Sequence, residues 1–130
     1  MVIDTSALLA LFQNEPGQDR VEDAINRSFL LFSSVNRTEL KGKLVGVGLF
    51  TPQAVDARLR LLDQVLEVVS FDAAQSDLAA LYYARRNPHN LSLGDCACLA
   101  LAEARGADVL TAERAWAKLP ALPFKVHLIR

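Results

Sequence analysis

The sequence predicts an α/β protein, a three-layer α/β/α sandwich with a central parallel sheet of about five strands. Short apolar runs alternate with helical patterns along the chain, which is typical of a parallel sheet with helices on both faces. The chain has 130 residues, the length of one domain, so we expect a single domain over 1–130. Hydrophobic residues make up 52% of the chain, which is ample for its core.

The first half of the chain is predicted to contain two strands and four helices. Residues 29–32 are apolar throughout, as expected for a strand buried on both faces. Ser33 and Ser34 supply an N-cap for the next helix, whereas Thr51 and Pro52 supply a cap hydroxyl and a first-turn proline for a later one. In chain order we expect a strand at 1–4, helices at 6–13 and 18–26, a strand at 29–32, and helices at 34–45 and 52–64.

The second half is predicted to contain three strands and three helices. Asp72 with Gln75, and Ser92 with Asp95, have the spacing of a capping box at a helix start. Gly106 closes the second of these helices. In chain order we expect a strand at 67–70, a helix from 72 to about 86, a loop at 87–90, a helix from 92 to 106, a strand at 108–110, a short helix at 113–118 capped by Thr111, and a strand at 125–129.

The composition argues against several classes of protein. The formal net charge is -1, so no overall charge draws the chain to nucleic acid or to a membrane surface. No apolar run reaches the ~18 residues of a membrane span, and the chain opens on the first strand, so we expect no secretion signal. Cys96 and Cys98 stand two apart in a predicted helix, where they cannot pair. These features predict a cytoplasmic protein without membrane contact.

Four acidic residues stand where a parallel sheet would bring them together. Asp4 ends the first strand and Glu113 follows the strand at 108–110. In a doubly wound sheet these strands are neighbours where the strand order reverses, and ligands bind in the crevice outside such strand ends. Glu39 lies in the helix after the second strand, and Asp95 lies in the first turn of an apolar helix. We therefore take the four acids as candidate catalytic residues.

Carboxylates gathered in one crevice need a counter-charge. A pair at ~5 Å costs about 3 kcal/mol at an effective dielectric of about 20, so such a cluster requires a cation or a bound proton. Hard oxygen ligands that stay open to water suit Mg2+ or Mn2+. The nearby sequence lacks the cysteine and histidine set that zinc prefers. The sequence therefore predicts a site for Mg2+ or Mn2+.

Each acid taken alone also has an ordinary structural explanation. Asp95 would complete the Ser92 capping box, Glu39 would be a solvated helix residue, and Glu113 would be a first-turn acid that the helix dipole favours. Asp4 is the hardest to explain in this way, because the end of a buried strand is an unusual place for a charge. The prediction of a site therefore depends on the joint positions of the acids.

Four segments, taken together, resemble those of a known family. In order and spacing they are similar to the motifs of PIN-domain proteins, and more closely to those of the VapC-type toxins of bacterial toxin-antitoxin pairs. The resemblance covers essentially the whole chain. The segments are Asp4-Thr5-Ser6-Ala7-Leu8-Leu9, Val35-Asn36-Arg37-Thr38-Glu39-Leu40, Leu91-Ser92-Leu93-Gly94-Asp95 and Val109-Leu110-Thr111-Ala112-Glu113-Arg114-Ala115-Trp116.

The resemblance implies a fold, an activity and partners. The family has an α/β/α sandwich and cleaves RNA with a bound metal ion, so similarity implies Asp4, Glu39 and Asp95 as metal-site acids. It also implies an RNA substrate, a cognate antitoxin that covers the groove of the toxin, and a homodimer. The residues expected to support the site are Ser6, Asn36 and Thr111.

One position departs from the family pattern. The family usually has an aspartate where this chain has Glu113, and the extra methylene moves the carboxylate by up to about 1.5 Å. Mg2+ demands near-ideal octahedral geometry, which puts direct ligation by Glu113 in doubt. Glu113 would then act through water, or the protein would have lost a second metal. Three intact acids still favour a working site.

Basic residues near the acids are candidate contacts for RNA phosphates. Such residues are also ordinary features of solvated helix faces, so both interpretations stay open. The candidates flank Glu39, precede the loop at 87–90 or follow Glu113. They are Arg37, Lys41, Arg85, Arg86 and Arg114.

These observations predict an endoribonuclease that hydrolyses a phosphodiester with metal-activated water. One alternative is a binding module with a weakened site, whose partner surfaces would come from the apolar positions of 44–50 and 55–65 unless these pack in the core. A phosphatase of the haloacid-dehalogenase type also begins with an aspartate after a strand. That chemistry usually wants a second aspartate where this chain has Ser6, so we rank it low.

Overall fold

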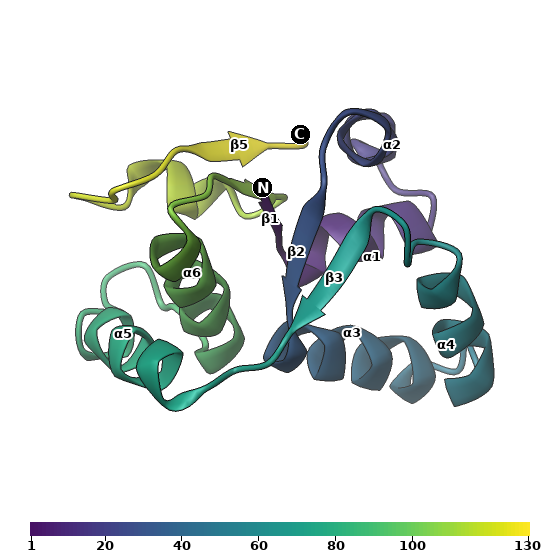
Figure 1. Ribbon diagram of the computed structural model, residues 1–130, viewed down its shortest axis with the longest axis horizontal. Helices are drawn as coiled ribbons and strands as arrows, with labels where there is room; N and C mark the ends of the chain where they lie inside the picture. The colour runs from purple at the N-terminus through teal and green to yellow at the C-terminus, as the bar shows by residue number, and fades with distance from the viewer.

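Five strands form one parallel sheet in the computed structural model, which describes residues 1–130 (Figure 1). Their order is β3-β2-β1-β4-β5, and every neighbouring pair is parallel. The predicted parallel sheet of about five strands is confirmed. The strands are β1 (Val2–Ile3), β2 (Leu30–Ser33), β3 (Leu66–Val69), β4 (Val109–Thr111) and β5 (Val126–Leu128).

The strand order reverses between β1 and β4. The chain runs outward from β1 through β2 to β3 and then places β4 on the other side of β1. Val2 pairs with Val109, Ile3 pairs with Leu110, and the backbone N–H of Asp4 donates to the Leu110 carbonyl oxygen at 3.0 Å. The two strands therefore end side by side, as the sequence predicts, with Asp4 at the point of reversal.

Helices cover both faces of the sheet, which confirms the three-layer sandwich. The helices α1 to α4 lie on one face and α5 and α6 on the other (Figure 1). Val2 and Ile3 belong to two different buried apolar clusters, because successive side chains of a strand point to opposite faces. The helices are α1 (Thr5–Phe12), α2 (Gln18–Arg27), α3 (Ser34–Gly46), α4 (Pro52–Arg60), α5 (Ala73–Ala84), α6 (Leu93–Arg105) and the short 3-10 helix η1 (Arg114–Lys118).

Only one of the two predicted capping boxes is complete. At the start of α6 the Ser92 hydroxyl accepts from the Asp95 backbone N–H at 3.1 Å, and Asp95 Oδ2 accepts from the Ser92 backbone N–H at 2.8 Å. At the start of α5 Asp72 caps the Gln75 backbone N–H at 2.8 Å. The Gln75 side chain does not accept from the Asp72 backbone N–H as a capping box requires. Its amide donates to the Ser70 carbonyl oxygen instead.

Two further expectations about the helices need correction. The helix expected to reach 64 ends at Arg60, and a turn carries the chain into β3. Thr111 does not cap the short helix, because it is the last residue of β4 and the N-cap is Glu113. The Thr111 hydroxyl does accept from the Glu113 backbone N–H at 3.0 Å, which fixes the turn between strand and helix.

Most apolar side chains that the sequence offered for partner surfaces pack in the core instead. Leu44, Val55 and Leu59 are buried, whereas Val47 and Leu49 are exposed. None of the helices combines the length and apolar character that crossing a membrane requires. Both cysteines are buried and free, as expected.

Candidate active site

A polar pocket of about 230 Å³ lies at the carboxyl ends of β1 and β4. No apolar residue lines it, and all four acids that the sequence singled out do. They come from three helix starts and one helix interior, so only the fold brings them together. We call this cavity the acid pocket; its lining residues are Asp4, Thr5, Ser6, Glu39, Lys43, Ser92, Asp95 and Glu113.

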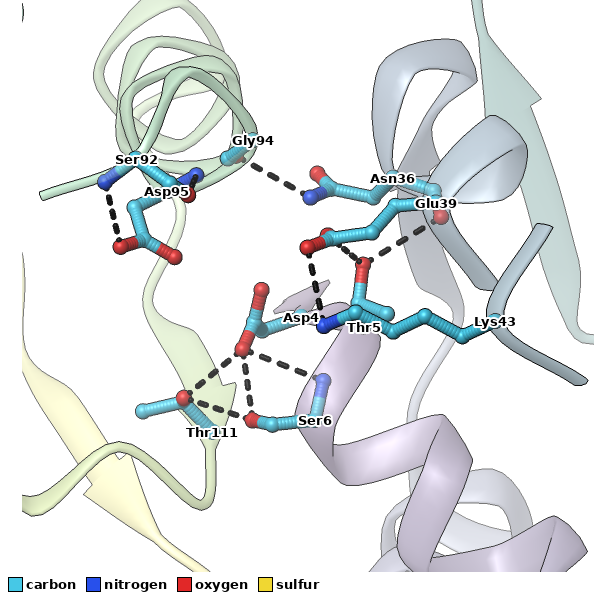
Figure 2. Close-up of polar contacts among 10 residues, drawn as sticks. All are labelled: Asp4, Thr5, Ser6, Asn36, Glu39, Lys43, Ser92, Gly94, Asp95 and Thr111. Carbon is cyan, nitrogen blue, oxygen red and sulfur yellow. Dashed lines mark hydrogen bonds and ion pairs between the residues drawn. The ribbon is translucent and has the colours of Figure 1, made fainter. Parts of the chain in front are cut away.

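Asp4 is held through one of its two carboxylate oxygens. Oδ2 accepts from the Ser6 hydroxyl at 2.6 Å, from the Ser6 backbone N–H at 3.2 Å and from the Thr111 hydroxyl at 3.0 Å. Oδ1 has no hydrogen-bond partner in the protein and points toward the space between Asp95 and Glu39 (Figure 2). Ser6 and Thr111 thus fix the direction of the carboxylate and leave one oxygen open.

Burial controls the protonation of Asp4. The side chain is almost fully enclosed, and this desolvation raises the pKa of its carboxyl from 3.8 to about 6. The charge of Asp95 raises the pKa further, while the hydrogen bonds from Ser6 and Thr111 lower it. Desolvation and repulsion exceed the hydrogen bonds, so the ionised carboxylate lacks a sufficient counter-charge.

Asp95 serves as a helix cap and as a pocket residue at the same time. Oδ2 is engaged in the capping box, whereas the other oxygen has no hydrogen-bond partner in the protein (Figure 2). Burial raises the pKa of the Asp95 carboxyl, the bonds with Ser92 lower it, and the charges of Glu113 and Glu39 raise it. The capping explanation from the sequence is therefore correct, and it does not exclude a site.

Glu39 is the third acid of the pocket and has both oxygens engaged. The Thr5 hydroxyl donates to Oε2 at 2.7 Å, and the Lys43 ammonium lies 3.1 Å from Oε1 (Figure 2). The Asn36 carbonyl oxygen is also 3.2 Å from the Thr5 hydroxyl, so Thr5 ties α1 to α3. Glu39 thus differs from Asp4 and Asp95, because its second oxygen pairs with the Lys43 ammonium.

Asn36 and Gly94 bring α3 and α6 together behind these acids. The buried Asn36 amide donates to the Gly94 carbonyl oxygen at 3.1 Å, and its supporting role at the site stays a prediction. A Cβ on Gly94 would lie 2.9 Å from Glu39 Oε2 and 3.3 Å from Glu39 Cδ. These distances are shorter than ordinary contacts, so Gly94 leaves the space that the Glu39 carboxylate occupies.

Glu113 lines the pocket from its exposed side. Its carboxylate makes no hydrogen bond or ion pair within the protein. Its charge raises the pKa of the Asp95 carboxyl. The side chain is therefore the least constrained of the four acids.

The five basic residues proposed for RNA binding lie outside the lining of the acid pocket. Two of them pair with Asp56 of α4, which lies 3.1 Å from the Arg37 guanidinium and 2.9 Å from the Lys41 ammonium. The Arg85 and Arg86 guanidinium groups lie over tyrosine rings of α5, and the Arg114 guanidinium approaches the Arg130 carbonyl oxygen at 3.4 Å. Their role in RNA binding stays a prediction.

The donor set of the acid pocket suits a hard divalent cation. It consists of carboxylate and hydroxyl oxygens, without cysteine or histidine. The acids do not form a closed ligand shell, since no group of three or more acid, histidine or cysteine side chains is arranged to enclose a metal ion. Mg2+ usually keeps several waters and takes only one or two carboxylates, so the open oxygens of Asp4 and Asp95 fit such an ion.

The sequence prediction missed three residues of the site. Thr5 stands beside Asp4, but a single threonine carries no spacing signal that would mark it as a site residue. Lys43 lies four residues after Glu39, and this i,i+4 spacing in a predicted helix is a signal that could have found it. Gly94 is recognisable only from the tertiary approach of Glu39.

Comparisons with known proteins identify the relatives of this chain. The sequence model of the PIN domain matches residues 1–122. A protein named Ribonuclease VapC from Mycolicibacterium smegmatis is 34% identical over 115 residues, which cover 85% of this chain and 88% of that protein. Ribonuclease VapC30 from Mycobacterium tuberculosis is 29% identical over 114 residues, covering 85% of this chain and 87% of that one.

Solved structures share the fold at lower identity. VapBC2 from Rickettsia felis, bound to a DNA fragment from its promoter, aligns with a TM-score of 0.73 and 14% identity over 98% of this chain and 96% of that chain. A toxin-antitoxin complex from Klebsiella pneumoniae aligns with a TM-score of 0.67 and 17% identity over 95% of this chain and 98% of that chain. These likenesses confirm the predicted fold.

Proposed function

The chain belongs to the PIN domain family, and from this premise we propose that it is a metal-dependent endoribonuclease, the toxin of a toxin-antitoxin pair. The relatives from Mycolicibacterium smegmatis and Mycobacterium tuberculosis are named as ribonucleases, which supports RNA as the substrate. Structures of the same fold include toxin-antitoxin complexes, which supports an antitoxin as its partner. We further propose a homodimer that acts in the cytoplasm.

One observation carries the proposal. Four carboxylates line a pocket without apolar residues, and burial and mutual repulsion raise the pKa of Asp4 and of Asp95. A fold that served only to bind a protein partner would gain nothing from this arrangement, because uncompensated carboxylates cost stability. The cost is understandable where a divalent cation and a phosphodiester occupy the pocket together.

Asp4 and Asp95 would hold the cation through their open oxygens, and Glu39 would join them by exchanging its Lys43 partner for the cation. Mg2+ or Mn2+ bound there would supply an activated water and would offset the charge that develops on the phosphate and on the departing oxygen. The chain itself positions the acids. Ser6 and Thr111 hold one oxygen of Asp4 so that the other faces the pocket, and Ser92 does the same for Asp95.

Among the pocket acids, Glu113 is exposed and makes no hydrogen bond, so its carboxylate is the one that would be free to accept a proton. In this assignment Glu113 need not touch the metal, which is consistent with its extra methylene.

The test is cleavage of structured RNA by the purified chain. We expect cuts with Mg2+ or Mn2+, none with EDTA, and none with the Asp4→Asn variant. Asp63→Asn, an exposed aspartate outside the pocket, is the matched control and should cut like the parent.

Two results would contradict the proposal. Parent protein that leaves every structured RNA uncut in both metals would favour the alternative of a binding module that works through protein association. RNA cleavage that persists in Asp4→Asn would assign the nuclease activity to another site or to a contaminant.

A further inference from the structure

One basic side chain lies inside the acid pocket. Lys43 is four residues after Glu39 on α3, and its ammonium is the only positive group in the lining. The ammonium forms an ion pair with Glu39 Oε1. Asp4 and Asp95 each have one carboxylate oxygen without a partner in the protein. No residue outside the pocket pairs with Lys43.

The charge of the pocket creates a problem for an RNA substrate. Four carboxylates surround the cavity, and a phosphodiester that enters it carries a negative charge of its own. Like charges at such short range repel by several kcal/mol in a partly buried site. A positive group belonging to the pocket would lower this repulsion further beside a metal ion, and the other basic residues considered on α3, Arg37 and Lys41, pair with Asp56.

We infer that Lys43 is the phosphate-binding residue of the acid pocket: its ammonium pairs with Glu39 in the absence of RNA and with a phosphate oxygen when RNA is bound. This inference rests on the proposed function and names a substrate contact within it. The Lys43 side chain is 55% exposed, and the pair with Glu39 is a partly exposed one. Such pairs contribute little stability, so exchanging one anionic partner for another costs little.

The same contact connects RNA binding to metal binding. A divalent cation that binds the Glu39 carboxylate competes with the Lys43 ammonium for it. Displacement from Glu39 frees the ammonium for the phosphate, and its four-carbon stem lets it move without a change in the backbone. Removing the charge of Lys43 should therefore have opposite effects on the two ligands.

The experiment compares the parent with Lys43→Met, Lys43→Arg and Lys125→Met. Calorimetric titration with Mn2+ should show about tenfold tighter binding to Lys43→Met, because a nearby positive charge is gone. With saturating Mn2+, KM for RNA should rise about tenfold while kcat changes much less. The slope of log KM against log salt should fall by about 0.7, the value for one lost phosphate contact on a single strand.

The other variants separate charge from structure. Lys43→Arg should keep most of the parent KM, and Lys125→Met, an exposed lysine outside the pocket, should match the parent in every measurement. Parent-like Mn2+ affinity and KM in Lys43→Met would overturn the inference while leaving the ribonuclease proposal intact. Parent protein without any RNA cleavage would defeat the ribonuclease proposal. Weaker binding of intact RNA by Lys43→Met than by the parent would then still support the phosphate contact, and equal binding would overturn it.

Discussion

Two charge clusters on opposite sides of α3 have the same spacing along the helix but different ratios of positive to negative groups. On one side Arg37 and Lys41, four residues apart, share the single carboxylate of Asp56, and we call this cluster the Asp56 clasp. On the other side Glu39 and Lys43, also four apart, belong to the acid pocket. The clasp has two positive groups for one negative group, whereas the pocket has one positive group for four negative ones.

The difference shows how the neighbours of a helix decide what its charges do. The hydrogen bond from Lys41 lowers the pKa of the Asp56 carboxyl, so the clasp favours its ionised form. In the pocket, burial and neighbouring acids raise the pKa of Asp4 and of Asp95. The clasp joins α3 to α4, while the pocket holds an excess of negative charge that a bound cation or a proton can offset.

Removing one acid from the pocket is the strongest way to break this contrast. Asp95→Asn keeps an oxygen that can accept from the Ser92 backbone N–H but removes the charge. We expect RNA cleavage to fall by about 100-fold or more, while Tm stays close to that of the parent. Ser92→Ala, which removes the cap hydroxyl and keeps the acid, is the comparison. A larger loss of activity in Ser92→Ala than in Asp95→Asn would contradict the ranking.

The charge excess should also appear as a pH dependence of stability. Without metal, the raised pKa of Asp4 makes the free energy of unfolding depend on pH. The stabilising contribution of the protonated Asp4 carboxyl is fully present below pH 3.8 and is lost as the pH rises through about 6. A shift of this size corresponds to about 3 kcal/mol between the two limits. In EDTA, the Tm of Asp4→Asn minus the Tm of the parent should therefore increase between pH 5 and pH 8. A constant gap over this range would show that Asp4 is not destabilised by its charge.

A third variant displaces the Glu39 carboxylate in the pocket without changing any charge. Gly94→Ala places a methyl group 2.9 Å from Glu39 Oε2, so Glu39 must move. We expect activity to fall about tenfold, since small displacements of catalytic groups are costly. Gly42→Ala, on α3 with open space around its Cβ, is the control and should retain activity. Equal activity in the two variants would show that the close approach of Gly94 and Glu39 is unimportant.

The smallest effect is expected from the clasp. Asp56→Asn releases Arg37 and Lys41 from their shared partner, and the partly exposed ion pairs should contribute little to stability. We expect a small fall in Tm by calorimetry. The KM for RNA should stay equal or fall slightly, because two positive groups become free. A marked loss of RNA cleavage would mean that the clasp positions Glu39 through α3.

Much of this molecule follows from local patterns in the sequence. Buried strands are apolar on both faces, and helix starts carry their own caps, which is why the order of elements could be predicted. The positions of Asp4 and Glu113 could be predicted because reversal of strand order places their strands side by side. The full capping box at Ser92 was also predictable, since it is a contact within four residues.

The remaining features depend on tertiary contacts that spacing does not encode. The pairing of Arg37 and Lys41 with Asp56 requires the packing of α4 on α3, so these residues seemed free for RNA. Thr111 looked like a helix cap, but its strand register directs its hydroxyl to Asp4. The helix at 52–64 ends early because its last residues form the turn into β3.

The double role of Asp95 has a consequence for the motions of the protein. Its carboxylate closes the first turn of α6, so any opening of that turn removes an acid from the pocket at the same moment. Local opening of a helix end is visible in amide hydrogen exchange. The Ser92 amide, which donates to Asp95 Oδ2, is then a direct probe of pocket assembly. Its exchange should slow when Mn2+ binds, and it would report pocket occupancy without any RNA present.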